Sequence, residues 1–136
     1  MTVRGLSVDP SDAVPLWKQI EENVRRLVAS GAMKPGSAMP SVRDLARDLS
    51  INPATVAKGY QHLVDAGILA VKRGEGTFVA EKLPTLPRGE REKELEEGAM
   101  RYASLAVTIG AANDEAVERV RGALKILRRK ETGGPE

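Results

Sequence analysis

Residues 40–67, PSVRDLARDLSINPATVAKGYQHLVDAG, hold the pattern that decides the fold. Ser41 is a good helix cap, and Asp44 follows three residues later in the arrangement of a capping box, with Asp in place of Glu. Apolar residues then recur at the spacing of one helical face. They are Val42, Leu45, Ala46 and Leu49. We therefore predict a short amphipathic helix here.

A second helix is expected after a tight connection at residues 50–52. Asn52 can cap it, and Pro53 suits its first position, where a missing N–H costs nothing. Its buried face would carry Val56, Tyr60, Leu63 and Val64. Gly67 fits the left-handed residue after a helix, so we expect the helix to end at Ala66. Two short helices joined by a tight turn predict a helix-turn-helix.

The sequence upstream predicts a third helix. Pro15 suits its first turn, and Gly31 stands where it should stop. The apolar stripe between them is Leu16, Ile20, Val24, Leu27 and Val28. Residues 1–13 are expected to form an extended arm ending in a turn, and residues 32–40 a loop.

Downstream, two β-prone runs flank a basic, glycine-rich turn. ILAV at residues 68–71 and TFVA at 77–80 enclose KRGEG at 72–76. This arrangement predicts a β-hairpin. Helix, short helix, tight turn, helix and hairpin together outline a winged helix-turn-helix, so the predicted fold class is mainly α with a small β-hairpin.

A proline-punctuated linker at residues 83–89 predicts a boundary between a winged domain, residues 1–83, and a second region, residues 84–136. We expect two helices in the second region. The first covers residues 90–109, and its stripe is Leu95, Ala99, Tyr102, Ala106 and Ile109. Asn113 is expected to cap the second. Its stripe is Ala116, Val117, Val120, Ala123, Leu124 and Leu127.

Composition excludes several classes of protein. The 136 residues include no cysteine and one histidine, which excludes disulfides, thiolate metal sites and histidine metal clusters. Because no signal core and no apolar run of about 20 residues is present, we expect a cytoplasmic protein without a membrane span. No activated nucleophile or phosphate loop is evident, so we expect no enzyme activity and no cofactor.

The net charge of +2 alone says little about binding to nucleic acid. The distribution of charge is uneven within the C-terminal region. Five glutamates lie within residues 90–97, whereas residues 119–130 hold six basic residues and no acid. Two interpretations stay open. The segments lie side by side, within one chain or across a dimer, or they are two solvated helix faces.

Polar residues outside the predicted core suit contact with duplex DNA, whose major groove admits an α-helix. Arg43 can grip phosphate or guanine with its forked guanidinium. Thr55 offers a hydroxyl and a methyl group, and Lys58 suits a phosphate. Backbone N–H groups at the helix start near Asn52 are expected to be unpaired and able to bind phosphate. Arg43 and Arg47 can also be ordinary solvated residues. The motif context favours DNA contact for Arg43, whereas for Arg47 neither interpretation is favoured.

The predicted hairpin tip offers a second group of contacts. Lys72 and Arg73 are cationic, and Gly74 and Gly76 let the backbone approach a ligand closely.

The sequence resembles the GntR family of winged-helix regulators, and within it the short YtrA-type branch. The residues that carry the match span 14–80 and are Pro15–Ile20, Gly31, Pro35–Gly36, Met39–Ala46, Ile51–Val56, Tyr60, Leu63, Gly67–Leu69 and Gly74–Val79. The tail resembles the YtrA-type dimerisation appendage in its length and its two expected helices.

The resemblance implies a repressor-like homodimer on a double-stranded, inverted-repeat operator. Its implied DNA contacts are Arg43, Asn52, Pro53, Ala54, Thr55, Arg73, Gly74 and Gly76, to which the residue chemistry above adds Lys58 and Lys72. The implied dimerisation contacts are Leu95, Ala99, Tyr102, Ala106, Ile109, Val117, Val120, Leu124 and Leu127. Whether a small-molecule effector binds stays open, and the short tail leaves little room for a pocket except between subunits.

Three positions depart from expectation. Ala54 and Ala57 stand where relatives often carry longer polar or basic residues, which limits base reading there. Gly59 within the second helix of the pair costs about 0.5–1 kcal/mol relative to Ala, and close helix packing would explain it.

Two other functions were weighed against DNA binding. One is a winged-helix protein-interaction module that no longer binds DNA, which the basic wing and the polar start of the recognition helix argue against. The other is a small enzyme, for which no catalytic group is evident. Individual residues also have structural roles, since Asn52 and Pro53 form a cap without DNA, and Trp17 and Tyr60 suit a core or an interface.

Overall fold

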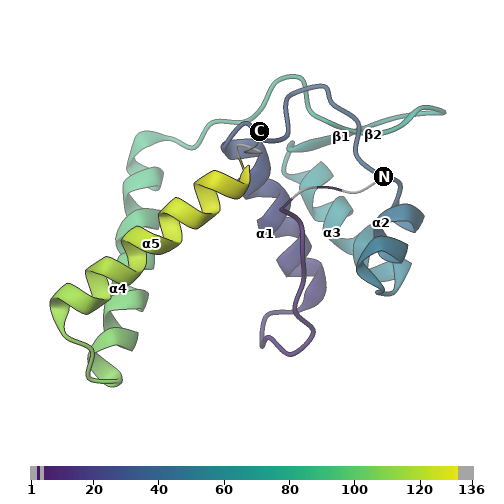
Figure 1. Ribbon diagram of the computed structural model, residues 1–136. Coiled ribbons are helices and arrows are strands. Elements are labelled where there is room, and N and C mark those ends of the chain that lie inside the picture. Colours follow the sequence, from purple (N-terminus) through teal and green to yellow (C-terminus); the bar gives the residue numbers. More distant parts are fainter. Residues whose placement is uncertain (1–2, 4, 132–136) are drawn as a thin grey trace. The chain divides into compact units, whose positions relative to one another are not determined.

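The computed structural model describes residue 3 and residues 5–131, with side chains as far as residue 128. The chain divides into two compact units, one running to Pro84 and one covering Thr85–Arg128. The first contains α1 (Leu16–Ala29), α2 (Val42–Leu49), α3 (Pro53–Asp65), β1 (Leu69–Lys72) and β2 (Gly76–Val79), and the second contains α4 (Arg88–Thr108) and α5 (Asn113–Glu131) (Figure 1). This arrangement confirms the predicted fold class.

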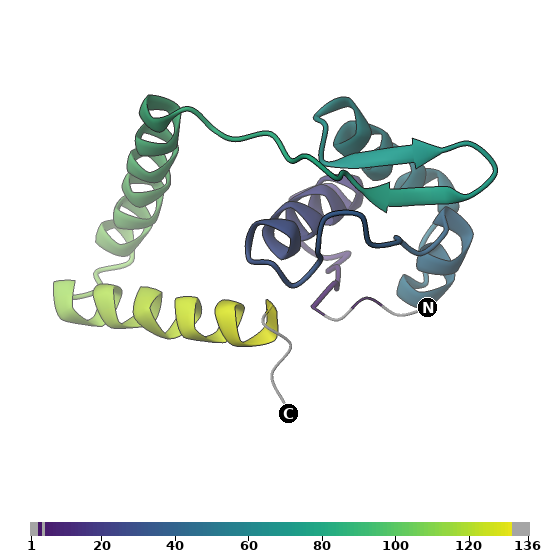
Figure 2. The ribbon, with the colours of Figure 1, turned by 90° about the horizontal axis from the view of Figure 1, so that it is seen from above.

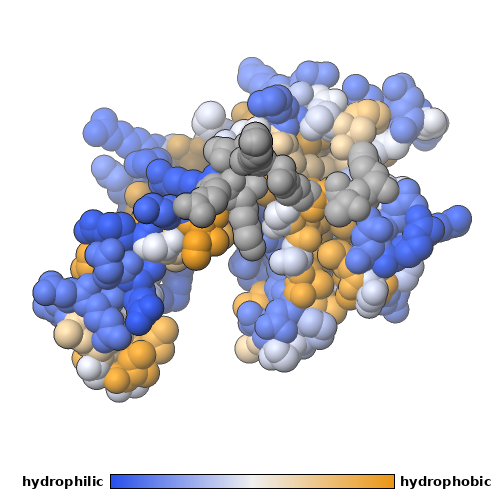
Figure 3. All heavy atoms as spheres, in the orientation of Figure 1, coloured by the Kyte–Doolittle hydropathy of each residue, from blue (hydrophilic) through white to orange (hydrophobic). Residues whose placement is uncertain are grey.

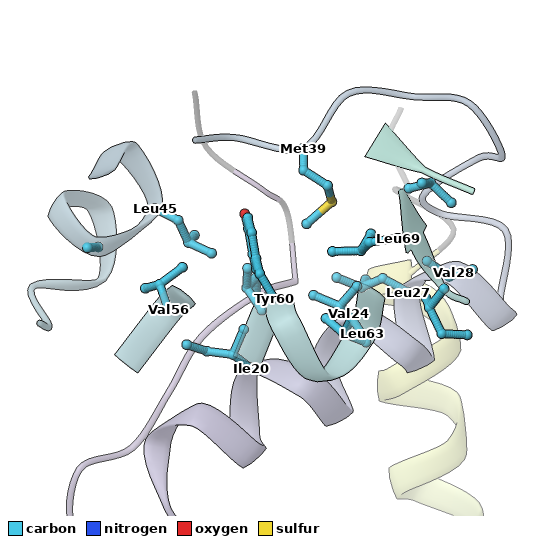
Figure 4. Close-up of a cluster of buried hydrophobic side chains, with 14 residues drawn as sticks. Ile20, Val24, Leu27, Val28, Met39, Leu45, Val56, Tyr60, Leu63 and Leu69 are labelled. Carbon is cyan, nitrogen blue, oxygen red and sulfur yellow. The ribbon is translucent and has the colours of Figure 1, made fainter. Parts of the chain in front are cut away.

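Aliphatic side chains from all three helices and the hairpin form the core of the first unit (Figure 4). Its fully buried members are Ile20, Val24, Leu27, Leu45, Val56, Leu63 and Val79. The helical positions among them fall on the predicted stripes, and Val79 lies in the second run of the predicted hairpin. Burying each such side chain contributes about 1.5–3 kcal/mol, so this shared core is what holds the short α2 in place.

Helices α1 and α3 approach each other closely at Gly59, which is buried. A Cβ added there would lie 3.0 Å from the carbonyl oxygen of Trp17 and 3.2 Å from Ile20 Cγ2. The expectation that close helix packing explains this glycine is therefore confirmed.

Local hydrogen bonds fix the start of α2 and the turn that joins it to α3. Ser41 Oγ accepts from the amide of Asp44 at 3.0 Å, which is half of the predicted capping box. Asp44 itself pairs with Arg47 on the next turn of α2. Ser50 ends the helix in the left-handed conformation at φ 57°, and the amide of Ile51 then donates to the carbonyl of Ala46 at 3.0 Å.

The hairpin is antiparallel, and its two strands lie side by side in Figure 2. The region predicted as a loop at residues 32–40 adds a third partner to it. Ala38 forms a bridge with Phe78, the amide of Met39 donates to Thr77 at 2.8 Å, and the amide of Val79 donates to Ser37 at 2.8 Å. The hairpin is thus attached to the segment that leads directly into α2.

Gln19 ties the N-terminal segment to α1. Its amide nitrogen donates to the carbonyls of Asp9 at 3.0 Å and Val14 at 2.8 Å, and its Oε1 accepts from the amide of Asp9 at 2.8 Å. The hydroxyl of Ser11, followed by its amide, lowers the pKa of the Asp9 carboxyl. The predicted turn before α1 is therefore held by side chains of α1 and of the turn itself.

The second unit consists of two helices joined by a short turn with Gly110 at φ +77°. The hydroxyl of Tyr102 donates to the carbonyl of Ala116 at 2.8 Å and links α4 to α5. Helix α4 begins at Arg88, two residues before the predicted start. Asn113 is the first residue of α5 rather than its cap.

The acidic and basic segments form contacts within their own helices. Arg88 pairs with Glu92 at 4.0 Å, and Arg119 pairs with Glu115 at 3.9 Å, with all four side chains exposed. In the single chain they are therefore solvated helix faces, and the side chains of residues 129 and 130 lie outside the described part. Over the described residues, no helix combines the length and the apolar character needed to cross a bilayer.

Candidate nucleic-acid interface

The two arginines on α2 differ in their partners. The Arg47 guanidinium is bound to the Asp44 carboxylate. Arg43 is exposed and forms no ion pair with any described residue. Its guanidinium is therefore available for an external phosphate or guanine, as the sequence predicts for Arg43 rather than Arg47.

The start of α3 corrects one expectation. Asn52 Oδ1 accepts from the amide of Ala54 at 2.8 Å, and the Asn52 carbonyl accepts from the amide of Thr55 at 3.0 Å. Pro53 has no N–H. The amides expected to bind phosphate are thus already satisfied, because the Asn52 cap uses them.

Side chains, rather than amides, are what the start of α3 presents. Asn52, Pro53 and Ala54 are exposed and Thr55 is half-buried. At the start of α2, the amides of Val42 and Arg43 have no acceptor within the described chain. The two helix starts therefore offer different groups to an external ligand, backbone amides at α2 and side chains at α3.

Lys58 does not extend freely into solvent. Its ammonium lies 4.7 Å from the ring centroid of Trp17 on α1. His62, one turn further along α3, lies against the same indole with ring centroids 4.4 Å apart. The predicted phosphate contact at Lys58 thus belongs to a cluster that joins α3 to α1.

At the hairpin tip, Arg73 is the freer of the two cations. The Lys72 ammonium lies 4.6 Å from the ring centroid of Phe78, whereas Arg73 is exposed and has no acidic partner among the residues the structure describes. Gly74 and Gly76 have φ values of +80° and +124°, with no atom within 4 Å of an added Cβ. The turn therefore needs glycine for its backbone, and the space beside it is open to a ligand.

A second surface lies in the helical unit, where α4 and α5 enclose an apolar groove of about 570 Å³. Five of the nine predicted dimerisation residues line it: Tyr102, Ala106, Val117, Val120 and Leu124. Leu95, Ala99, Ile109 and Leu127 are exposed but lie outside its lining. Apolar atoms gather at the α4–α5 turn in Figure 3, where Leu105, Val107 and Ile109 are more than half exposed.

Sequence reasoning missed two features of these surfaces. One is the pairing of residues 36–39 with β2, and the other is the contact of Trp17 with Lys58 and His62. The i, i+4 spacing of Lys58 and His62 was a visible signal, but the side chain they share is on another helix. No cluster of His, Cys, Asp or Glu in the described chain is suited to hold a metal ion.

Comparison with known proteins gives a consistent result. The model of the family "Bacterial regulatory proteins, gntR family" matches residues 16–79. The HTH-type transcriptional repressor YtrA of Bacillus subtilis is 40% identical over 80 residues, which are 59% of this chain and 62% of YtrA. The HTH-type transcriptional regulator Rv1152 of Mycobacterium tuberculosis is 32% identical over 112 residues, which are 82% of this chain and 88% of Rv1152.

Solved structures support the same fold. YtrA from Sulfolobus acidocaldarius, a GntR-family transcription factor, superposes with a TM-score of 0.57 at 30% identity and covers 71% of this chain and 98% of that one. A transcriptional antiterminator from Listeria monocytogenes gives a TM-score of 0.73 over 99% of this chain and 98% of its own. At 21% identity, that second match concerns the fold alone.

Proposed function

The chain belongs to the gntR family of bacterial regulatory proteins, and from this premise we propose that it is a transcriptional repressor that binds an inverted-repeat operator as a homodimer. The family consists of regulators rather than enzymes. Because its target would be operator DNA, the protein would act in the cytoplasm.

The observation that carries the proposal is a pair of exposed cations that form no ion pair with a described residue, Arg43 at the start of α2 and Arg73 at the hairpin tip. In this reading α3 enters the major groove, while α2 crosses the phosphate backbone and brings Arg43 to it. Arg73 contacts a phosphate or the neighbouring groove. Ala54 is exposed at the start of α3 and offers a methyl contact only, so base reading there depends more on Thr55.

The apolar groove between α4 and α5 supports a dimer. Val117, Val120 and Leu124 line the groove and are 53%, 39% and 45% exposed in the single chain. Contiguous apolar surface of this kind marks a protein–protein contact. A second copy would cover it and place two α3 helices in successive major grooves, about 34 Å apart.

Repression would then be steric. A dimer bound across a promoter blocks access by RNA polymerase. Of the two relatives compared above, YtrA of Bacillus subtilis is named a repressor, whereas Rv1152 is named a regulator.

The deciding experiment is an operator-binding titration. Duplexes selected from a random pool, and the DNA upstream of the protein's own gene, are titrated at several salt concentrations. The Arg43→Ala variant should bind the selected operator more weakly, with a salt slope lower by about 1 if Arg43 contacts a phosphate, or by about 1–3 kcal/mol if Arg43 reads a base. The matched control is Arg25→Ala, since Arg25 is also exposed but pairs with Glu21 on α1.

Unchanged affinity in Arg43→Ala would overturn the assignment of Arg43. The competing function is a protein-interaction module that no longer binds DNA. It would be favoured if the dimer forms but no duplex is preferred over random sequence.

A further inference from the structure

Three side chains gather around the indole of Trp17, which is half-buried on the first turn of α1. The Lys58 ammonium lies 4.7 Å from the ring centroid, and the His62 ring lies 4.4 Å from it at an interplanar angle of 32°. The ammonium of the neighbouring Lys18 lies 6.0 Å away. Lys58 and His62 are both exposed, and each has one side packed against the indole.

The contact is a direct result of how α1 and α3 pack. Gly59 lets the backbone of α3 approach the carbonyl of Trp17, and this brings the neighbouring Lys58 within reach of the indole. Along α3, residues four apart lie on one face. Lys58 is therefore one turn above Ala54 on the exposed face, and His62 is one turn above Lys58.

The charge of Lys58 is not neutralised by a carboxylate. Neither Lys58 nor Lys18 forms an ion pair with a described residue, and the nearest acid along α3, Asp65, accepts a hydrogen bond from Gln61. A lysine over an aromatic face keeps its full charge while its flexible stem is restricted. An ordered and uncompensated ammonium on this face suits a phosphate group.

We propose that Trp17 is a positioning residue for DNA binding, which holds the Lys58 ammonium beside α3 for contact with one backbone phosphate of the operator. The inference rests on the proposed function and adds a residue that none of the predicted contacts includes. Trp17 acts through Lys58 and does not itself touch DNA. His62 packs against the same indole and helps to fix its orientation.

The test is a double-mutant cycle on the full-length protein, with the selected operator duplex as the probe between about 50 and 200 mM salt. Lys58→Met keeps the length of the stem and removes the charge. It should lower the slope of log K against log salt by about 0.9, the value for one lost phosphate contact. Trp17→Leu should weaken binding about two- to fivefold in the wild-type background. In the Lys58→Met background it should have no further effect.

The conservative variant Trp17→Phe separates positioning from folding. It keeps an aromatic face for Lys58, so it should retain most of the affinity that Trp17→Leu loses. Thermal unfolding of each variant confirms that the binding titrations use folded protein.

Two results would overturn the inference. One is a Lys58→Met variant with an unchanged salt slope, and the other is an equal loss from Trp17→Leu in both backgrounds, which is the mark of a purely structural role. If these occur while Arg43→Ala still weakens operator binding, the proposed function stands and this inference fails. If the wild-type protein prefers no duplex, both fail together.

Discussion

At the scale of single residues, Gly59 and Tyr60 set how the recognition helix sits in its unit. Gly59 permits the close approach to α1, and the buried Tyr60 donates from its hydroxyl to the carbonyl of Pro40 at 2.8 Å. One residue thus fixes α3 to α1, and the next fixes it to the segment before α2. The two neighbours thus attach α3 to two different parts of the unit.

Replacing Gly59 by Ala should lower the free energy of unfolding by about 1–2 kcal/mol. The gain in helix propensity of about 1 kcal/mol is outweighed because the added methyl group meets a backbone carbonyl and the buried Ile20, neither of which can move freely. The control is Gly98→Ala in α4, where the nearest atom to an added Cβ is the flexible Arg101 side chain at 3.7 Å. Urea unfolding should show opposite signs for the two variants, and stabilisation by Gly59→Ala would contradict the packing argument.

Tyr60→Phe should lower stability by about 1 kcal/mol near neutral pH, because the Pro40 carbonyl loses its donor. Burial raises the pKa of the Tyr60 phenol above its usual value of 10.0. Above that pH the unfolded chain releases the phenol proton while the folded chain keeps it, so folding of the wild type loses up to about 1.4 kcal/mol per pH unit. The gap between wild type and variant should therefore shrink as the pH rises above 10. A gap that stays constant through that range would refute the assignment.

At the scale of elements, the turn between α2 and α3 depends on one residue in an unusual conformation. Ser50 has a φ of 57° and ends α2 so that α3 can begin three residues later. Non-glycine residues adopt this conformation at a cost of about 1–2 kcal/mol. Ser50 is thus one of the positions, with Gly59 and Tyr60, that set the orientation of α3.

Ser50→Val should destabilise the protein by about 1–2 kcal/mol, because a β-branched side chain is least compatible with the left-handed region. Ser50→Gly, the matched variant, should leave stability equal or slightly higher. Thermal melts followed by circular dichroism distinguish the two. Equal melting temperatures for Val and Gly would mean that the turn adopts another conformation.

The helices and the hairpin could be predicted from the sequence because their signals are local. Caps such as Ser41 and Asn52, the glycine after α3 and the apolar periodicities all lie within a few residues of the element they define. The strand-like pairing of residues 36–39 could not be predicted, because its partner β2 lies about forty residues later.

The same difference between local signals and long-range contacts decides which parts of the candidate site could be predicted. The exposed positions of Arg43 and Arg73 followed from periodicity and turn chemistry. The contact of Lys58 with Trp17 depends on how two helices cross, which local spacing does not encode. The use of the α3 amides, in contrast, follows from the Asn52 cap that the sequence does indicate, and this consequence of the cap was missed.

At the scale of the whole molecule, the proposed dimer makes the two units interdependent in function. The winged unit has a core of its own, whereas the apolar side chains of α4 and α5 remain largely exposed in a single chain. A lone winged unit would meet only one half-site. Its affinity would then lack the contribution of the second half-site.

A chain that ends at Leu83 should be monomeric, because it lacks the apolar groove. In the full chain, Leu124→Glu should weaken or abolish the dimer, since Leu124 lines that groove. Ile126→Glu is the matched control, because Ile126 is also exposed and apolar but lies outside the groove lining. Analytical ultracentrifugation gives the masses, and a dimeric 1–83 fragment would refute the assignment of the interface.

The environment of Trp17 also has a spectroscopic consequence. It is the single tryptophan of the chain, and it lies against two side chains of the recognition helix. With excitation at the red edge of the absorption band, where the two tyrosines absorb little, the emission therefore comes from one fluorophore, and that fluorophore faces α3. Without any attached dye, changes in emission would report the state of the recognition helix during unfolding or on addition of DNA.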